Sequence, residues 1–211
     1  MPSSGIVHVI DDDQALRESL VFLFKTARIP VKAYESATAF LEDLPRVEGG
    51  CVVTDVRMPG ISGIDLLKRL RELKNEIPVI VITGHGDVPL AVEAMKHGAS
   101  DFLEKPFDDE LLLAAVRSAL SEQAAAQEDQ ALRATLKQRL ALLSTRERQV
   151  LDGLIAGHPN KTIAYDLGIS PRTIEIYRAN VMTKMEAASL SELVRMALTA
   201  GVLGKGGSGT S

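Results

Sequence analysis

The sequence predicts an α/β domain with a doubly wound, five-stranded parallel sheet, joined by a helical linker to an all-α domain. The chain has 211 residues, which is more than one typical domain needs. Short apolar runs alternate with segments of helical period over the first 120 residues or so, and strong helix formers dominate after Asp108. The two parts of the chain also differ in net charge, which is negative in the first and slightly positive in the second. Residues 1–123 carry 13 Lys and Arg against 20 Asp and Glu, and residues 141–211 carry 8 against 6.

The first part has five apolar runs that are expected to form strands: IVHVI, VKAY, CVVT, PVIVIT and SDFLEKP. Five segments of helical period follow these runs in turn: Leu16 to Ala27, Ser36 to Leu44, Leu66 to Leu73, Val88 to Met95, and the segment that begins after Asp108. Strands that are apolar at nearly every position and joined by helices indicate a parallel sheet covered on both faces.

The predicted domain boundaries place an α/β domain at residues 1–122, a helical linker at 123–141, a helix-turn-helix domain at 142–204 and a flexible tail at 205–211. Four leucines of the linker region form one apolar stripe: Leu132, Leu136, Leu140 and Leu143. The stripe is too short for the three or four heptads of a coiled coil, so we expect it to pack between the domains.

Several classes of protein are disfavoured by composition. The apolar runs are far shorter than a membrane span of about 20 residues, and no basic patch precedes an apolar segment at the amino terminus, so we expect a cytoplasmic protein with no membrane partner. Cys51 is the only cysteine and lies in an apolar run, which indicates a buried thiol and allows no internal disulfide. The four histidines lack metal-ligand spacing.

Polar side chains follow four of the predicted strands. Asp11 and Asp12 follow the first strand, Asp55 the third, Thr83 the fourth and Lys105 the fifth. In an open parallel sheet, ligands bind outside the carboxyl ends of the strands. Clustered carboxylates repel one another unless a cation joins them, and hard oxygen ligands suit Mg²⁺. One carboxylate can then attack phosphorus while the metal and a lysine neutralise charge on the phosphoryl oxygens.

An Asp after a strand is more often a turn residue or a helix cap, and Asp13 is expected to cap the next helix. The combination of DDD, TDVRMPG, TGHG and FLEKP after four successive strands favours phosphoryl chemistry over that simpler reading. A Thr hydroxyl can donate to a phosphoryl oxygen, and the glycine after Thr83 leaves room for the group to enter.

With these motifs, about residues 5 to 122 resemble the receiver domain of bacterial two-component response regulators, which has a flavodoxin-like fold. The resemblance implies that Asp55 is the phosphoacceptor and that Thr83 and Lys105 contact the phosphoryl group. It also implies that Asp12 and Asp55 bind Mg²⁺ together with the backbone carbonyl of Arg57, and that Asp11 acts near the metal, through water. Phe102 holds the position of the switch aromatic residue, although its position equally suits a core residue. The Lys105-Pro106 bond resembles the cis bond common in receivers, and the sequence leaves cis or trans open.

Capping residues mark the helices of the second part. Ser144 precedes a helix with Glu147 three residues later, as a capping box requires. Asn160 is expected to cap the next helix, Gly168 to end it, and Ser170 to cap a helix that begins with Pro171. Two short helices joined by a tight glycine turn form a helix-turn-helix.

The helix from Pro171 to about Met185 has an apolar stripe of Ile174, Val181 and Met185, and charges elsewhere. A solvated charged face is the simpler reading of those charges. The preceding turn favours entry into a DNA major groove. This block resembles the DNA-binding domains of the LuxR and NarL type, and its pairing with the receiver, together with HPNKTIA and SPRTIEIYRANVM, is similar to the FixJ group.

The resemblance makes Pro171 to Lys184 the recognition helix and Ser189 to Ala200 a helix for dimerisation on DNA. The predicted contacts with phosphates or bases are Lys161, Arg172, Arg178 and Lys184, with Thr173 and Glu175 as further base readers. Tyr177 stands where many relatives have His, so no base preference is carried over.

Together these features predict a transcription regulator, most simply an activator, that a sensor histidine kinase of the FixL type phosphorylates at Asp55. The phosphorylated form is expected to be a homodimer on double-stranded promoter DNA with RNA polymerase as a further partner. The resemblance suggests oxygen-responsive or nitrogen-fixation promoters. An enzyme alternative is a Mg²⁺-dependent phosphohydrolase, which the absence of a second acid two residues after Asp55 disfavours. A second alternative is a constitutive DNA binder whose receiver serves only for dimerisation.

Overall fold

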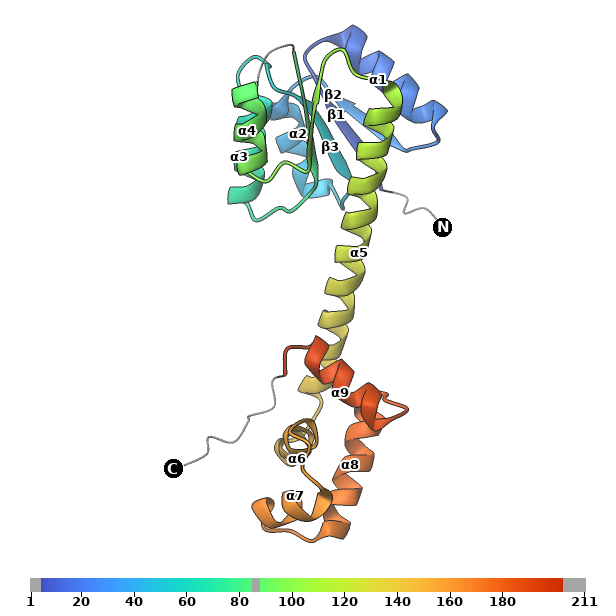
Figure 1. Cartoon of the computed structure of the whole chain (residues 1–211), viewed down its shortest axis with the longest axis vertical. Helices are drawn as coiled ribbons and strands as arrows, with labels where there is room; N and C mark the ends of the chain where they lie inside the picture. The colour runs from blue at the N-terminus through green and yellow to red at the C-terminus, as the bar shows by residue number, and fades with distance from the viewer. Residues whose placement is uncertain (1–4, 85–87, 203–211) are drawn as a thin grey trace. The chain divides into compact units, whose positions relative to one another are not determined.

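The computed structural model describes residues 5–84 and 88–202, and it divides the chain into two compact units, Met1–Gln127 and Glu128–Ser211 (Figure 1). The predicted tail at 205–211 lies outside the described residues, as do the last two residues of the TGHG motif. The boundaries at residues 122, 141 and 204 stay predictions.

The first unit contains one sheet of five parallel strands in the order β2-β1-β3-β4-β5 (Figure 1). Its strands are β1 (Val7–Ile10), β2 (Val31–Tyr34), β3 (Cys51–Asp55), β4 (Val79–Thr83) and β5 (Asp101–Glu104). The helices between them are α1 (Gln14–Thr26), α2 (Ala37–Asp43), the short 3-10 helix η1 (Leu44–Arg46), α3 (Gly63–Glu72) and α4 (Val88–Lys96), and α5 (Asp109–Ala141) follows β5. The fold class predicted from the alternating pattern is confirmed.

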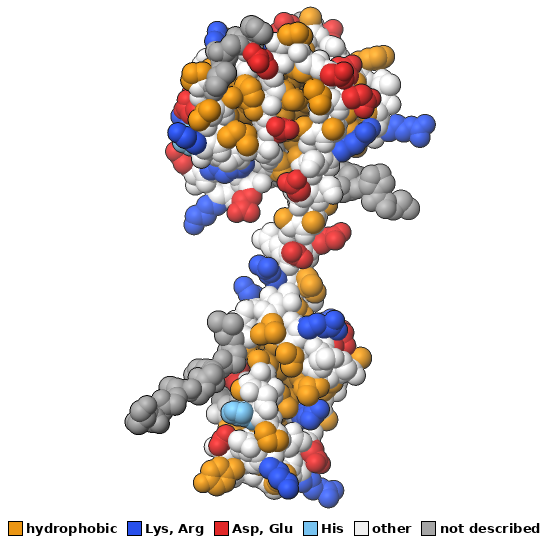
Figure 2. All heavy atoms as spheres, viewed as in Figure 1, with side chains coloured by type: hydrophobic (Ala, Val, Ile, Leu, Met, Phe, Trp, Pro, Cys, Tyr) orange, Lys and Arg blue, Asp and Glu red, His pale blue; other side chains and the backbone are white. Residues whose placement is uncertain are grey.

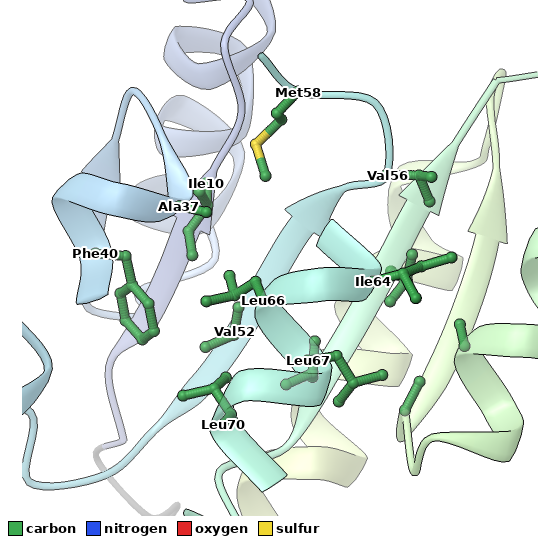
Figure 3. Close-up of a cluster of buried hydrophobic side chains, with 14 of the residues drawn as sticks. Ile10, Ala37, Phe40, Val52, Val56, Met58, Ile64, Leu66, Leu67 and Leu70 are labelled. Atoms are coloured by element: carbon green, nitrogen blue, oxygen red, sulfur yellow. The ribbon is translucent and has the colours of Figure 1, made fainter. Parts of the chain in front are cut away.

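Two hydrophobic cores lie on opposite faces of the sheet. Alternation along β3 shows why both faces are apolar: Val52 packs with α2, α3 and α4, whereas Cys51 and Val53 pack with α1 and α5. In Figure 3 the side chains of Leu66 and Leu70 on α3 lie over Val52 in the first of these cores, with Phe40 of α2 beside them. The sheet is thus held rigidly between two helical layers, and its strand ends have fixed positions.

Three of the four leucines of the predicted stripe pack inside the second unit. Leu136 and Leu140 are buried there with residues of the following helices, and Leu143 packs against the same core. Leu132 is about half exposed. The expectation that the stripe packs between domains is therefore replaced by a role in one core. The last turns of α5 belong to the second unit.

Four helices complete the second unit: α6 (Thr145–Ile155), α7 (Asn160–Leu167), α8 (Pro171–Met185) and α9 (Leu190–Thr199). The capping box of Ser144 and Glu147 is present, and Ser170 caps α8 through the N–H of Thr173. Gly168 ends α7 in the left-handed conformation at φ 65°, which favours glycine.

The predicted cap of α7 is wrong by one residue. Asn160 is the first residue of the helix, and Pro159 occupies the capping position without a side-chain hydrogen bond. Pro159 has extended backbone at φ −68° and ψ 153°, so the chain enters the helix immediately after it.

No helix among residues 5–84 and 88–202 is both long and apolar enough to cross a membrane.

Candidate functional site

The predicted polar residues meet where the strand order changes direction. β1 pairs with β3 in register, with Ile10 opposite Thr54, so Asp11 and Asp55 follow at the same edge of neighbouring strands. The connections from β1 and β3 leave toward opposite sides of the sheet, toward β2 and β4 respectively. This position is the topological switch point, the place where open parallel sheets bind their ligands.

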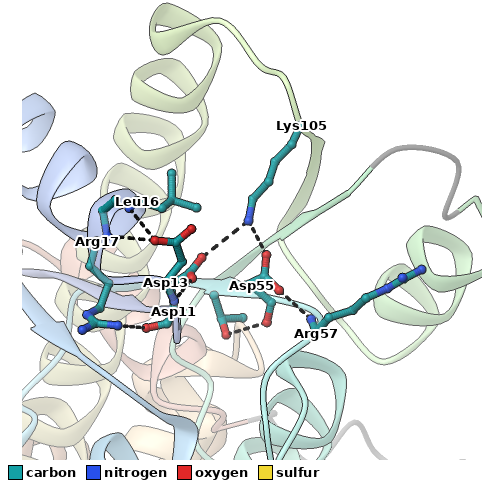
Figure 4. A network of polar contacts seen from close by, with 9 residues as sticks. Asp11, Asp13, Leu16, Arg17, Asp55, Arg57 and Lys105 are labelled. Atoms are coloured by element: carbon teal, nitrogen blue, oxygen red, sulfur yellow. Dashed lines mark hydrogen bonds and ion pairs between the residues drawn. The ribbon is translucent and has the colours of Figure 1, made fainter.

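Asp55 is the last residue of β3 and is held from two sides. Its side chain is buried, and Lys105 Nζ donates to Oδ1 at 2.5 Å while the backbone N–H of Arg57 donates to Oδ2 at 2.6 Å (Figure 4). The hydroxyl of Thr54 donates to the Asp55 carbonyl at 3.1 Å. These contacts fix the carboxylate at the end of the strand without covering it completely.

Lys105 brings the second carboxylate into the site. Its Nζ lies 3.5 Å from Asp11 Oδ2, so one ammonium group faces both Asp11 and Asp55 (Figure 4). Burial lowers the pKa of Lys105, but the hydrogen bond and charge of Asp55, followed by the charge of Asp11, outweigh it and the net shift is upward. Burial raises the pKa of Asp11, and the Asp13 N–H and the Lys105 charge oppose that rise only in part.

The loop after β1 holds Asp11 through its own hydrogen bonds. Asp11 Oδ1 accepts from the N–H of Asp13 at 2.8 Å, and the Asp11 carbonyl accepts from Arg17 Nη1 at 2.6 Å. Asp13 caps α1 by accepting from the N–H groups of Ala15 and Leu16, as predicted. Arg17 is not among the residues that the motifs predict. A motif could not predict this contact, because the partner of Arg17 is a backbone carbonyl, which any residue type supplies. The only hint in the sequence is that Arg17 lies one helical turn after the cap residue Asp13.

The other predicted residues of the first unit lie on the loop after β1 and on β4 and β5. Thr83 is fully buried at the end of β4, and its carbonyl accepts from the N–H of Lys105 at 2.8 Å, which keeps the ends of β4 and β5 together. The side chain of Asp12 is exposed. Phe102 is half-buried against the core formed with α2, α3 and α4. The Lys105-Pro106 bond is cis.

A divalent cation fits the two converging carboxylates. Among the described residues, no three His, Cys, Asp or Glu side chains form a group able to hold a metal ion. Asp11 and Asp55 nevertheless share one cationic group, the ammonium of Lys105. Mg²⁺ keeps several waters and is commonly bound by one or two carboxylates, so this donor set suits it.

The second unit places α7 and α8 as a helix-turn-helix with the turn at Gly168. Lys161 on α7 and Arg172 and Glu175 on α8 are exposed, whereas Thr173 and Arg178 are half-buried. Figure 2 shows Lys and Arg side chains at the end of this unit where α7 and α8 meet. The exposed residues are therefore available to a ligand that lies along α8.

Lys184 has partners inside the second unit. Its Nζ donates to Glu147 Oε2 at 2.7 Å and to the carbonyl of Leu142 at 3.1 Å. Glu147 is buried and belongs to the capping box of α6, so this ion pair joins α8 to the start of α6. A structural role accounts for these contacts, and they lend no support to the prediction that Lys184 contacts DNA.

A buried aspartate beside a lysine at the switch point of a doubly wound sheet, followed in the same chain by a helix-turn-helix, defines a receiver with a DNA-binding output domain. Comparison with known families agrees. Residues 7–117 match the family model for the response regulator receiver domain, and residues 141–197 match that for bacterial regulatory proteins of the luxR family.

Named relatives cover almost the whole chain. The transcriptional regulatory protein FixJ of Azorhizobium caulinodans is 62% identical over 96% of this chain and 96% of its own length. FixJ of Rhizobium meliloti is 54% identical over 92% of this chain and 96% of its own length. Among solved structures, full-length FixJ from B. japonicum is 56% identical with a TM-score of 0.60, covering 95% of this chain and 99% of that one. The response regulator StyR is 40% identical with a TM-score of 0.84, covering 92% and 98%.

The chain thus belongs to the response regulators of two-component systems, within the FixJ group. A receiver joined to a LuxR-type domain implies a histidine kinase as phosphoryl donor and DNA as ligand, in a phosphorylation-activated transcription regulator.

Proposed function

We propose that Asp55 accepts the phosphoryl group and thereby turns this regulator on. The observation that carries the proposal is the placement of the Asp55 carboxylate at the switch point, with Lys105 Nζ 2.5 Å from Oδ1. An Asp55 oxygen attacks the phosphorus of a phosphohistidine on the kinase. The O–P bond forms as the N–P bond breaks, and the imidazole leaves with the electron pair.

The neighbouring residues each have a task in this step. Lys105 neutralises charge on the phosphoryl oxygens, and the buried Thr83 hydroxyl donates to one of them once the group is attached. Mg²⁺ bound by Asp55, Asp12 and the Arg57 carbonyl, with Asp11 acting through water, would supply further neutralisation of those oxygens. The pairing of Asp11 and Asp55 around one ammonium supports a cation site between them.

The phosphorylated receiver is proposed to dimerise through the face formed by α4, β5 and α5. Val92 and Met95 expose about half of their side chains on α4. Together with Phe102 they line an open apolar hollow of about 600 Å³ on that face. Inward movement of Phe102 would change the shape of this hollow, which gives phosphorylation at the neighbouring strand end a route to the dimer surface.

The DNA-binding unit is proposed to occupy paired half-sites in promoter DNA, with α8 in the major groove and α9 between the two copies. Lys161, Arg172 and Arg178 are the proposed phosphate or base contacts, and Thr173 and Glu175 the further base readers. Contact with RNA polymerase would then make the protein an activator. The chain shares high sequence identity with FixJ of several bacteria and 44% identity with a nodulation protein W. These similarities support the proposal that it acts at oxygen-responsive or nitrogen-fixation promoters and receives its phosphoryl group from a FixL-like kinase.

The test compares the full chain with Asp55→Asn after treatment with acetyl phosphate or beryllofluoride and Mg²⁺. We expect the wild-type chain to dimerise by light scattering and to footprint on DNA selected from a random duplex library. Asp55→Asn should remain monomeric and bind at the unstimulated level. Asp129→Asn, which removes an equal charge at an exposed position of α5, should respond as the wild type does.

Two results would refute the proposal. If Asp55→Asn dimerised and bound DNA as strongly as the treated wild type, Asp55 would not be the switch, and the receiver would be a constitutive scaffold. If the wild-type chain released phosphate repeatedly from common phosphoesters in the presence of Mg²⁺, the chain would act as a phosphohydrolase.

A further inference from the structure

Helix α8 has an outward line of residues directly opposite its buried stripe. The buried residues are Ile174, Val181 and Met185, each with no exposed surface. With 3.6 residues per turn, the line on the far side runs through Arg172, Ile176, Ala179 and Thr183, and all four are exposed. In a helix-turn-helix, the outward face of the second helix enters the major groove.

Ile176 is the unusual member of this line. Its side chain is 58% exposed and has no place in the core of the second unit, although it is a large β-branched hydrocarbon. Single exposed hydrophobic residues are common on protein surfaces. This one, however, lies one turn after Arg172 at the middle of the face that would meet base edges.

The neighbours of Ile176 limit what else can fill the groove at this point. Ala179 presents only a methyl group, and the Thr183 hydroxyl donates its one proton to the Ala179 carbonyl at 3.0 Å, so that proton is used within the helix. An isoleucine side chain has no hydrogen-bond donor or acceptor and cannot read the polar pattern of a base. The apolar group that the major groove offers is the C5 methyl of thymine.

We propose that Ile176 is a specificity-determining residue that selects thymine through contact with its C5 methyl group. The inference rests on the proposed function, because it needs α8 to lie in the major groove. It assigns to an apolar residue a role that the motifs predict only for the polar and charged residues of α8. Arg172, one turn earlier on the same line, would then contact a base or a phosphate of the neighbouring base pair.

The experiment replaces thymine by uracil, which removes the methyl group and leaves every hydrogen-bonding group in place. A duplex is first selected from a random library with the full-length, beryllofluoride-treated chain. Each thymine of that duplex is then changed singly to uracil. For the wild type we expect one replacement in each half-site to weaken binding about fourfold. This is the change in affinity expected when one methyl-sized group is no longer buried away from water.

The variants decide whether Ile176 makes that contact. Ile176→Ala should bind the thymine and uracil duplexes equally, and Ile176→Val, which keeps methyl groups on Cβ, should retain part of the preference. Neither variant should change the salt dependence of binding, because no phosphate contact is lost. Leu132→Ala, at a half-exposed position of α5, should behave as the wild type.

The outcomes separate this inference from the function on which it rests. If the selection enriches no duplex, the proposed function fails. If it enriches a duplex but thymine-to-uracil changes act equally on the wild type and Ile176→Ala, the inference is overturned. Loss of promoter activation by Ile176→Ala with unchanged DNA affinity would also overturn it, since Ile176 would then face a protein.

Discussion

At the scale of single residues, the proposed phosphoryl site depends on one ammonium group that faces two carboxylates. Lys105 Nζ faces both Asp55 and Asp11, and without it two buried negative charges would repel each other across the switch point. The ammonium therefore suits the proposed phosphoryl group, and the two carboxylates suit the proposed cation. The position of the Asp55 carboxylate depends also on an uncharged residue, Gly63.

Gly63 has this effect because a Cβ there would lie 2.2 Å from the Asp55 carbonyl oxygen and 3.1 Å from Thr54 Cγ2. We expect Gly63→Ala to lower the free energy of unfolding of the first unit by about 1–3 kcal/mol, since backbone must move to accept the methyl group. The displaced carboxylate should also slow phosphorylation by acetyl phosphate. Urea denaturation and the rate of dimer formation measure the two effects.

Gly84→Ala is the matched control for stability, because a Cβ at Gly84 meets no atom within 4 Å in the part of the chain that the structure describes. It should change the free energy of unfolding by less than about 0.5 kcal/mol. Equal stability of Gly63→Ala and the wild type would show that the first residue of α3 is not in close steric contact with the Asp55 backbone.

At the scale of elements, α8, the proposed recognition helix, is fixed near its C-terminal end by the helices beside it. Lys184 bonds to Glu147 at the start of α6, and Arg139 near the end of α5 donates to the Met185 carbonyl at 3.0 Å. Lys184, through its hydrogen bond, and the N–H of Ser144 hold the pKa of Glu147 below its usual range. These contacts orient α8 so that its outward line faces away from the domain.

Lys184 should therefore affect stability more than the electrostatics of DNA binding. We expect Lys184→Gln to lower the free energy of unfolding of the second unit by about 1–2 kcal/mol, because a buried carboxylate loses its cation. The slope of log affinity against log salt should stay unchanged. Lys161→Gln on the exposed surface of α7 should do the reverse, reducing that slope by about one with stability unchanged. A salt slope that fell in Lys184→Gln would contradict this expectation and support the sequence-based prediction that Lys184 contacts DNA.

At the scale of the whole molecule, the two units have separate hydrophobic cores. The cores of the first unit and the core of the second share no residue, and α5 contributes Leu112 and Val116 to one unit and Leu136 and Leu140 to the other. Each unit can therefore be stable alone, provided that it keeps its own part of α5.

A fragment of residues 128–211 should thus unfold cooperatively, whereas a fragment of residues 142–211 should not. The shorter fragment lacks Leu136 and Leu140, and loss of a buried leucine costs about 2–5 kcal/mol each, comparable with the whole stability of a small domain. Circular dichroism during heating compares the two. Leu132→Ala in the longer fragment is the control and should change little. Equal melting of both fragments would contradict this division of α5.

Sequence alone predicted the architecture because each element has a local signal. Apolar runs followed by helical periods gave the order of strands and helices, and Asp13, Ser144 and Ser170 marked helix starts through side chains that bond within three residues. The same locality predicted which strands end in Asp11, Asp55, Thr83 and Lys105, since the carboxyl ends of parallel strands share an edge. The resemblance then supplied the roles proposed for them.

Only the tertiary structure decided how side chains distant in sequence pair. Periodicity marks Leu136 and Leu140 as apolar but cannot say which core receives them, and charge marks Lys184 as basic without showing that Glu147, 37 positions earlier, binds it. Ile176 has the residue type of the core, and its exposure follows from which face of α8 its neighbours cover. Hydrogen bonds between neighbouring residues can be predicted from the local sequence. The long-range partners of a side chain and its burial depend on contacts that exist only once the helices are packed.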